Sequence, residues 1–517
     1  MQHLIRETRL WPLVEERAGL TPDALLGQDE LGRSLTFGAF QVRAERVAAA
    51  LAERGVGPGD RVAWQLPGWL ESFVLVAALA RIGAVQSPIL PIYREREVGF
   101  ILRQARPKLF VVPREWRGFA FETYARQLLT EIVSESQPMS LLVCDRSLPE
   151  ASPHELPPWE PGNERSPRWI FYTSGTTGDP KGALHSDETL GAGSLGVAER
   201  FELSPDDRYP VVFPFTHIGG IGMLFVQLMT GCSAALVEQY DEQKTPSFLA
   251  EQDITLAAGG TPLVMRYLQY QRQHPEHRLF PRLRMAMGGA APKPPQLHDE
   301  VKEHLGGAGV VSVYGLTEVP FAAVGSPRDP DVALATTEGR GAGGAELRCV
   351  SADGRSCATG VEGELQVRGP QVCIGYLDSA RDAEAFTDDG WFRTGDLARL
   401  DADGFVSVTG RLKEIIIRKG ENISAKEVED VLYAHPGIRE IAVIGVPDAE
   451  TGERCCAVVV AEPNAALDLD ELARFCRTAG LATQKWPERL EQLDELPRNA
   501  SGKVRKIDLE RRFGERE

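Results

Sequence analysis

Several features that mark particular classes of protein are missing from this sequence. Its 8 cysteines include no C-x-x-C pair, and its 9 histidines form no cluster at ligand spacing, so we expect neither structural zinc nor a disulfide framework. Basic residues are outnumbered by acidic ones. The formal net charge of -17 argues against a general nucleic-acid or anionic-membrane binder, because a phosphate surface would repel the chain.

No segment is expected to enter or cross a membrane. Residues 1–11 carry charges and have no apolar core, so we expect no signal peptide. The stretch 219–237 has no charged residue, but its glycines and polar residues favour a buried helix, a turn at Gly231 and a strand. We therefore expect a reduced, cytoplasmic protein without an integral membrane segment. Any anionic ligand must then meet a local basic site.

The composition is that of an ordinary soluble globular protein, with 43% hydrophobic and 25% charged residues. At 517 residues the chain is long for one core, so two or more domains are expected. A strand at 61–66, a helix at 69–82 and a strand at 84–89 predict a βαβ unit and a parallel sheet. The same alternation predicts helices at 41–54, 98–105, 122–134, 186–200 and 262–273, and strands at 108–112, 141–143, 254–258, 283–287 and 310–313.

The most distinctive stretch is 172–182, Tyr-Thr-Ser-Gly-Thr-Thr-Gly-Asp-Pro-Lys-Gly, which follows a strand-like apolar run. Glycines let the backbone approach a ligand, hydroxyls supply donors, and Lys181 adds a cation, so the stretch predicts a phosphate cradle. It is not a Walker A loop, because Lys181 is followed by Gly182 rather than Ser or Thr. An ordinary polar turn is the alternative.

The stretches 288–291 and 314–318 each follow a predicted strand and form a sterically open place where a flat base could lie, although a tight turn is the simpler interpretation. Three later stretches are polar or charged and also have simpler interpretations: a turn aspartate for 390–396, a solvated face for 410–414, and a solubilising tail for 496–506. His217 lies between a strand end and a glycine pair, although a lone histidine is more often a packed or surface residue.

Taken in order, these motifs resemble those of the adenylate-forming superfamily of acyl-CoA synthetases, peptide-synthetase adenylation domains and luciferases. The resemblance implies a mixed α/β fold. A large N-terminal AMP-binding domain of stacked βαβ subdomains would span residues 1–411, and a small mobile α+β domain would span 412–517. Lys413 would be the hinge, although the family often has Asp at 413 or 414. Within the superfamily, 86–94 and 484–488 resemble short- and medium-chain or cyclohexanecarboxylate ligases.

The resemblance also implies roles for individual residues. Lys503 would enter the adenylation site as the catalytic lysine, Glu318 would ligate magnesium, and His217 would line the acyl pocket. The tyrosine at 314 would stack on adenine, and Asp396 would accept from the ribose hydroxyls. The nucleotide and its phosphates would be held by Thr173, Ser174, Gly175, Thr176, Thr177, Gly178, Lys181, Gly289, Ala290, Ala291, Tyr314, Gly315, Thr317, Asp396, Arg411, Lys413 and Gly420.

The implied reaction is the ATP-dependent activation of a carboxylic acid to an acyl adenylate, followed by transfer to coenzyme A with release of AMP. ATP, Mg²⁺ and CoA would be the cofactors, and the small-molecule partners would be a carboxylic acid, ATP and CoA, with no nucleic acid. Transfer of the acyl group to a carrier protein or an amine is the alternative. A catalytically silent nucleotide-binding protein is disfavoured by Lys503, Glu318 and Asp396 together. The sequence does not identify the acid. It does not determine the oligomeric state either, and a homodimer is possible.

Overall fold

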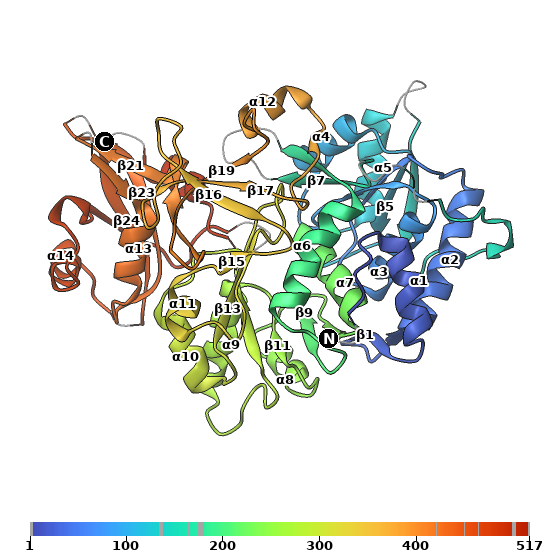
Figure 1. Ribbon diagram of the computed structural model, residues 1–517, viewed down its shortest axis with the longest axis horizontal. Coiled ribbons are helices and arrows are strands. Elements are labelled where there is room, and N and C mark those ends of the chain that lie inside the picture. Colours follow the sequence, from blue (N-terminus) through green and yellow to red (C-terminus); the bar gives the residue numbers. More distant parts are fainter. Residues whose placement is uncertain are drawn as a thin grey trace.

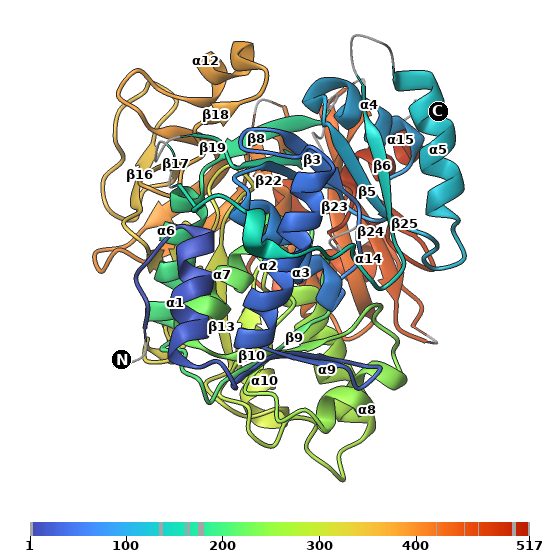
Figure 2. The same cartoon turned by 90° about the vertical axis from the view of Figure 1, so that its right-hand side faces the viewer.

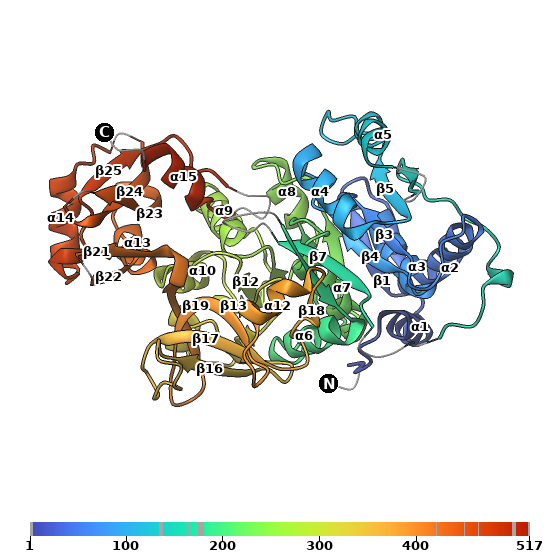
Figure 3. The same ribbon diagram turned by 90° about the horizontal axis from the view of Figure 1, so that it is seen from above.

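The computed structural model arranges the chain as successive β-sheets with helices packed on them. It describes residues 4–133, 138–160, 162, 166–173, 180–419, 421–448, 450–463, 465–498 and 503–514. In Figure 1 the blue amino-terminal elements lie on the right and the red carboxyl-terminal elements on the left. Figure 3, a view from above, shows the same two ends far apart. The prediction of a mixed α/β fold is confirmed.

The first sheet contains the predicted βαβ alternation. Its elements are β3 (Arg61–Trp64), α3 (Leu70–Arg81), β4 (Val85–Pro88), α4 (Glu95–Ala105), β5 (Leu109–Pro113), α5 (Phe121–Ile132), β6 (Ser140–Cys144), β7 (Trp169–Thr173), β8 (Lys181–His185) and β18 (Gly375–Tyr376). The strand order is β18-β8-β7-β4-β3-β5-β6. Strands β3, β4, β5 and β6 pair in parallel, as strands joined by helical crossovers must. In contrast, β8 pairs antiparallel with both β7 and β18.

A second sheet, with the order β2-β1-β10-β9, lies next to it. Its elements and helices are α1 (Leu10–Leu20), β1 (Leu25–Asp29), β2 (Ser34–Thr36), α2 (Phe37–Glu53), α6 (Asp187–Arg200), β9 (Arg208–Val211), α7 (Ile218–Thr230) and β10 (Ser233–Leu236), with the short helix η1 (Pro153–Glu155) in the connector. The uncharged stretch 219–237 is α7, a turn and β10, as predicted. Among the described residues, no helix is long and apolar enough to span a bilayer.

Helix α1 was not predicted, because its charges disguise how deeply it is buried. Arg17 is 1% exposed. Its guanidinium donates from Nε to the carbonyl of Leu228 at 2.7 Å and from Nη2 to that of Met229 at 2.9 Å. These carbonyls belong to the last turn of α7, where backbone acceptors have no partner within the helix. Figure 2 shows α1 beside α2 and α7.

The third sheet supplies strand ends that face the candidate site. Its elements are α8 (Lys244–Ala250), β11 (Leu256–Ala257), α9 (Thr261–Gln273), β12 (Met285–Gly288), α10 (Gln296–His304), β13 (Val310–Tyr314), β14 (Ala323–Val324), α11 (Asp331–Thr336) and β15 (Arg340–Gly341). Strands β11, β12 and β13 are parallel neighbours. Their carboxyl ends therefore meet at one edge, the edge at which open α/β sheets bind ligands.

The fourth sheet is antiparallel and was largely missed by the sequence analysis. It contains β16 (Glu346–Val350), β17 (Gly363–Arg368), β19 (Phe392–Leu400) and β20 (Val406–Arg411), with η2 (Ser379–Arg381) and α12 (Asp382–Ala385) between β17 and β19. Asp396 lies inside β19 and pairs with Arg411 of β20. The alternatives of a turn aspartate and a solvated face at these two positions are therefore wrong.

The carboxyl-terminal residues form a unit with its own core. Its elements are η3 (Leu412–Glu414), β21 (Ile415–Arg418), β22 (Glu421–Ser424), α13 (Ala425–Tyr433), β23 (Ile438–Asp448), β24 (Gly452–Ala461), α14 (Leu469–Thr478), η4 (Thr483–Lys485), β25 (Arg489–Gln492) and α15 (Lys506–Phe513). Leu432 and Leu472 pack on one side of the central strands. Leu509 of α15 packs in a separate apolar cluster. A small α+β unit results, as predicted.

We predict that Gly231→Ala destabilises the protein. Gly231 ends α7 with φ +80°. A Cβ there would lie 3.0 Å from Nη1 of Arg17. The left-handed conformation costs a non-glycine residue about 1–2 kcal/mol, so the midpoint of thermal unfolding should fall. Gly19→Ala is the matched control, because Gly19 is exposed in α1 and open space surrounds its Cα; its midpoint should stay or rise. Equal midpoints for both variants would contradict this account.

Candidate active site

The expected phosphate loop connects β7 to β8. These strands form an antiparallel hairpin in which Thr173 pairs with Lys181, so the loop begins and ends at the edge of the first sheet. Five predicted site residues, Ser174, Gly175, Thr176, Thr177 and Gly178, lie outside the described residues. The ammonium of Lys181 lies 5.5 Å from the ring centroid of Tyr376 in β18.

The predicted motif 314–318 follows β13 and is held by its backbone. Val319 and Leu316 exchange two backbone hydrogen bonds of 3.1 Å, which close a tight turn. The carbonyl of Thr317 accepts a 2.8 Å hydrogen bond from Nε2 of His185, the last residue of β8. Burial lowers the pKa of His185 to about 4, so the imidazole is neutral and donates from Nε2.

Glu318 is held by two contacts from one segment, one to its side chain and one to its backbone. The hydroxyl of Tyr376 donates to Oε1 of Glu318 at 2.7 Å. The backbone N–H of Cys373 donates to the carbonyl of Glu318 at 2.8 Å. A carboxylate has about four acceptor positions, so one hydroxyl donor leaves room for a cation.

Glu318 fits a magnesium ligand. Among the described residues, no three His, Cys, Asp or Glu side chains gather into a ready-made metal site. Magnesium is commonly bound through one or two carboxylates together with nucleotide phosphates and water, so a lone carboxylate near a phosphate loop matches its preference.

The end of β12 has only small residues and requires glycine at one of them. Gly289 has φ +139°, and a Cβ there would lie 2.5 Å from the carbonyl of Val313 in β13. The backbone N–H of Gly289 donates to Oγ1 of Thr261, and its carbonyl accepts from the N–H of Thr261. Ala290, the next residue, also has a positive φ of 62°. This backbone surface, which continues to Ala291, suits a flat base.

Asp396 brings the third and fourth sheets together. Its Oδ2 accepts from the hydroxyl of Tyr314 at 2.6 Å, and its Oδ1 accepts from Nε of Arg411 at 2.8 Å. Asp396 is 3% exposed. Each carboxylate oxygen keeps a second acceptor position, which is what binding of two ribose hydroxyls requires. Burial and the neighbouring carboxylate raise the pKa of Tyr314 well above its usual range, so the phenol remains a donor.

Lys503, from the carboxyl-terminal unit, lies near Asp396 and Arg411. Burial and the nearby Arg411 lower its pKa, while the charges of Glu414 and Asp396 oppose that shift. Lys506 pairs with Glu414 at 3.0 Å and with Glu429 at 2.7 Å. In contrast, Lys413 is exposed in η3, and Gly420 lies outside the described residues.

His217 borders a mainly apolar cavity. It is the N-cap of α7, and its Nδ1 accepts from the N–H of Gly219 at 3.1 Å. Burial lowers its pKa, so the imidazole is neutral. The hydroxyls of Tyr172 and Thr216 are buried beside the cavity, and within the described part of the chain neither has a hydrogen-bond partner. The lining residues are Pro88, Ile89, Leu90, Tyr93, Ile101, Phe171, Tyr172, Thr216, His217, Ile218 and Thr317.

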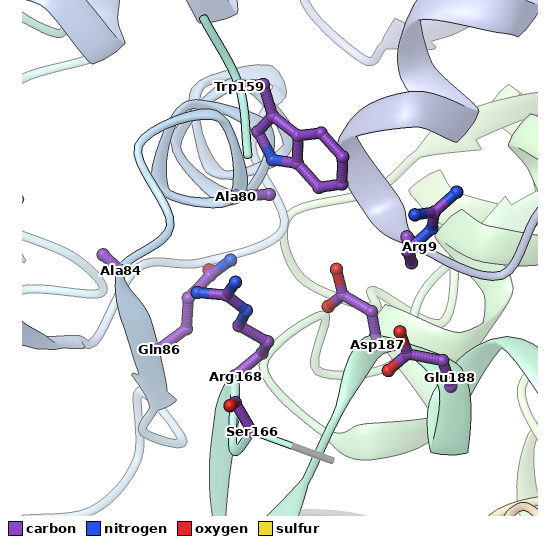
Figure 4. Close-up of a pocket in the computed structure, with 9 residues that line it drawn as sticks. All are labelled: Arg9, Ala80, Ala84, Gln86, Trp159, Ser166, Arg168, Asp187 and Glu188. Carbon is purple, nitrogen blue, oxygen red and sulfur yellow. The ribbon is translucent and has the colours of Figure 1, made fainter. Parts of the chain in front are cut away.

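A second pocket contains none of the predicted site residues. Figure 4 shows it lined by Arg9, Ala80, Ala84, Gln86, Trp159, Ser166, Arg168, Asp187 and Glu188. Its buried carboxylate, Asp187, accepts from the N–H of Leu10 at 3.0 Å and from the indole of Trp169 at 2.8 Å. These contacts tie the amino-terminal segment to β7 and α6, a structural role.

Comparison with known proteins identifies the family. The sequence profile described as "AMP-binding enzyme" matches residues 14–377, and that of the "AMP-binding enzyme C-terminal domain" matches residues 427–503. The chain belongs to the AMP-binding enzyme family. The predicted superfamily is thereby confirmed.

Individual relatives resemble the chain over nearly its whole length. A medium-chain fatty-acid–CoA ligase of Escherichia coli is 32% identical over 96% of this chain and 88% of that protein. An indoleacetate–CoA ligase of Aromatoleum aromaticum is 34% identical over 96% of both. The crystal structure of ATP-bound MatB from Rhodopseudomonas palustris superposes with a TM-score of 0.87 at 29% identity, covering 97% of this chain and 99% of that one.

This AMP-binding enzyme is an AMP-forming acid–CoA ligase. It activates a carboxylic acid with ATP to an acyl adenylate and transfers the acyl group to coenzyme A. ATP, Mg²⁺ and CoA are its cofactors. Transfer to a carrier protein or an amine is not favoured.

The sequence analysis missed the residues that hold the site together. Tyr376, His185 and Cys373 each contact the turn at 317–318, yet none was predicted. His185 ends a strand that pairs with β18 only after the chain has passed through strands of three further sheets. The sequence offers one local signal, the Gly-Tyr pair at 375–376, and the structure shows that Gly375 has a positive φ.

We predict that the adenylation rate falls at alkaline pH because Lys503 loses its proton. Its pKa is lowered, so the decrease should be centred below 10.5, the ordinary lysine value. The rate of pyrophosphate release across the pH range measures this. Lys503→Arg should move the decrease to higher pH, because guanidinium stays protonated. If the rate of Lys503→Arg decreases over the same pH range as that of the wild type, the titrating group is not Lys503.

Proposed function

We propose that Asp396, Tyr314 and Arg411 bind the nucleoside of ATP and that Lys503 is the catalytic lysine. The arrangement around Asp396 carries this proposal: two donors fix a buried carboxylate, and a lysine from the carboxyl-terminal unit lies within range of its charge. A fixed acceptor for ribose beside a mobile cation for phosphate is what nucleotidyl transfer needs. The backbone of Gly289, Ala290 and Ala291 would border the adenine.

The phosphates would be held by the loop between β7 and β8. Its donors would include Thr173 and Lys181, with Ser174, Gly175, Thr176, Thr177 and Gly178 between them, and Thr317 and Gly315 on the facing turn. Glu318 would hold magnesium, which neutralises charge on the phosphate oxygens.

In the first step a carboxylate oxygen of the acid attacks the α-phosphorus, and the bond to the β-phosphate oxygen breaks. Pyrophosphate leaves with the electron pair. Negative charge grows on the α-phosphate oxygens, and the Lys503 ammonium and the backbone donors of the loop stabilise it. The half-buried position of Lys503 strengthens this attraction, because the effective dielectric is lower there than in water.

In the second step the CoA thiol, losing its proton, attacks the acyl carbon, and AMP leaves. The adenylate must be protected from water while it forms, and it must then become accessible to the thiol. Both requirements are met if the small C-terminal domain closes over the site during adenylation and then rearranges. We propose that residues 1–411 form the N-terminal domain and 412–517 the mobile C-terminal domain, with Lys413 as the hinge. Lys413 is exposed in η3, directly after β20, where a change of backbone angles meets little resistance. Gly420 would then approach the active site.

The acid itself is proposed to carry an uncharged, mainly apolar acyl group. The described residues that line the cavity beside His217 include no Asp, Glu, Lys or Arg, so a second charge on the substrate would be desolvated without a partner. The names of the relatives above, which act on a medium-chain fatty acid and on indoleacetate, agree with such a pocket.

We propose that the protein is cytoplasmic, acts on small molecules and binds no nucleic acid. The cysteines are free thiols, as a reducing compartment favours, and the net charge is -17. Light scattering on the purified chain would distinguish a monomer from a homodimer.

Pyrophosphate release with a panel of acids tests the function. With ATP, Mg²⁺ and CoA, we expect turnover of octanoate, cyclohexanecarboxylate or indoleacetate and little turnover of sulfoacetate, whose second charge the pocket cannot pair. Acyl-CoA should appear with AMP. Failure to form acyl-CoA from any acid of the panel would remove the proposal. Preference for sulfoacetate would contradict the apolar pocket.

We predict that Lys503→Ala slows adenylation by about a hundredfold or more, as loss of one transition-state donor does. Thioester formation from a preformed adenylate should keep its rate. Single-turnover assays of the two half-reactions separate these effects. Lys426→Ala is the control, since Lys426 is a cation of the same unit that pairs with Asp430. Equal loss of both half-reactions in Lys503→Ala would contradict the assigned role.

A further inference from the structure

Tyr376 contacts two candidate groups that come from different parts of the chain. Its hydroxyl donates to Glu318 Oε1 at 2.7 Å, and its ring centroid lies 5.5 Å from the ammonium of Lys181. We propose that Tyr376 is a positioning residue, which orients the magnesium-binding carboxylate of Glu318 and sets the cation of the phosphate loop beside it. This inference rests on the proposed function.

The backbone around Tyr376 leaves the side chain little freedom. In β18, Tyr376 pairs with Ala183 and Gly375 pairs with Leu184 of β8. The N–H of Tyr376 donates to Oδ1 of Asp382 at 2.8 Å. Gly375 has φ +151°, and a Cβ there would lie 2.9 Å from the same carboxylate. Tyr376 itself is 5% exposed, so the ring cannot turn away from its two partners.

The hydroxyl contact has a fixed direction. An ionised carboxylate can only accept hydrogen bonds, so the Tyr376 hydroxyl is the donor in this 2.7 Å contact. One acceptor position of Oε1 is thereby used, and the remaining positions of the carboxylate face other directions. A carboxylate held in this way is preorganised for a cation, as hydrogen bonds from outer groups orient metal ligands in general.

The ring contact links the same tyrosine to the loop. A cation within about 6 Å of an aromatic centroid is attracted by the ring quadrupole. Lys181 begins β8, and its position therefore depends on the ring as well as on the pairing with Thr173. Tyr376 thus couples the place of the metal to the place of the loop cation.

A purely structural tyrosine is the competing interpretation. The ring packs with Ala183 and Cys373 in a small apolar cluster, and Ala385 and Phe386 lie against it. Tyr376→Phe distinguishes the two, because phenylalanine keeps this packing and the face toward Lys181 while it removes the hydroxyl. Tyr209→Phe is the matched control: Tyr209 is a buried tyrosine of β9 whose hydroxyl donates to the carbonyl of Met223.

The first measurement is metal binding at equilibrium, with Mn²⁺ as the probe and a non-hydrolysable ATP analogue present. We expect Tyr376→Phe to weaken Mn²⁺ binding by about tenfold, a usual effect of removing a hydrogen bond to a metal ligand, while Tyr209→Phe binds as the wild type does. The Mg²⁺ concentration for half-maximal pyrophosphate release should rise by a similar factor. Thioester formation from a preformed adenylate should be unchanged. Unchanged Mn²⁺ binding in Tyr376→Phe would overturn the proposal, whether or not an acid substrate has been found.

A double-mutant cycle tests whether Tyr376 acts through Glu318. In a Glu318→Gln background, Tyr376→Phe should weaken Mn²⁺ binding no further, because the carboxylate that it orients is gone. Full additivity of the two losses would overturn the proposal. The wild-type protein distinguishes failure of this inference from failure of the proposed function. If the wild type binds Mn²⁺ but turns over no acid, the ligase assignment alone is contradicted.

Discussion

The carboxylate of Asp396 is the contact on which the geometry of the candidate site depends. It accepts from Tyr314 at the end of β13 and from Arg411 at the end of β20, so it joins the third and fourth sheets. Lys503 of the carboxyl-terminal unit lies within range of its charge. Asp396 lies directly opposite Arg411 in the pairing of β19 with β20, so the two side chains are cross-strand neighbours. Loss of this carboxylate would leave the half-buried guanidinium of Arg411 without its hydrogen-bonded counter-charge.

Much of the fold follows from local sequence patterns. Apolar runs of strand and helix length, separated by glycine turns, predicted the alternation from β3 to β6, and the parallel pairing confirms it. Helix α1 could not be predicted in this way, because Arg17 looks like a surface residue until the carbonyls of α7 are placed around it. A buried charge is visible only when its distant partners are known.

The same limit applies to the candidate site. Motifs such as 314–318 and 390–396 could be recognised because their residues are neighbours in the chain. The residues that hold the 314–318 motif, His185 and Tyr376, lie far from it in sequence, and the β8–β18 pairing brings their strands together beside it. No periodicity or composition signals a pairing between strands that lie so far apart, since loop closure and tertiary packing decide it.

The ion cluster formed by Lys506, Glu414 and Glu429 lies wholly within residues 412–517. A buried ammonium normally resists any movement that separates it from its counter-charges, because desolvated ions are expensive to leave unpaired. Here the cation and both anions belong to one body. If that body turns about Lys413, the cluster travels intact, and the change of arrangement requires little electrostatic reorganisation within it. The free-energy change of this domain rotation would therefore come from the groups at the boundary between the two domains, above all those that contact Asp396 and Arg411.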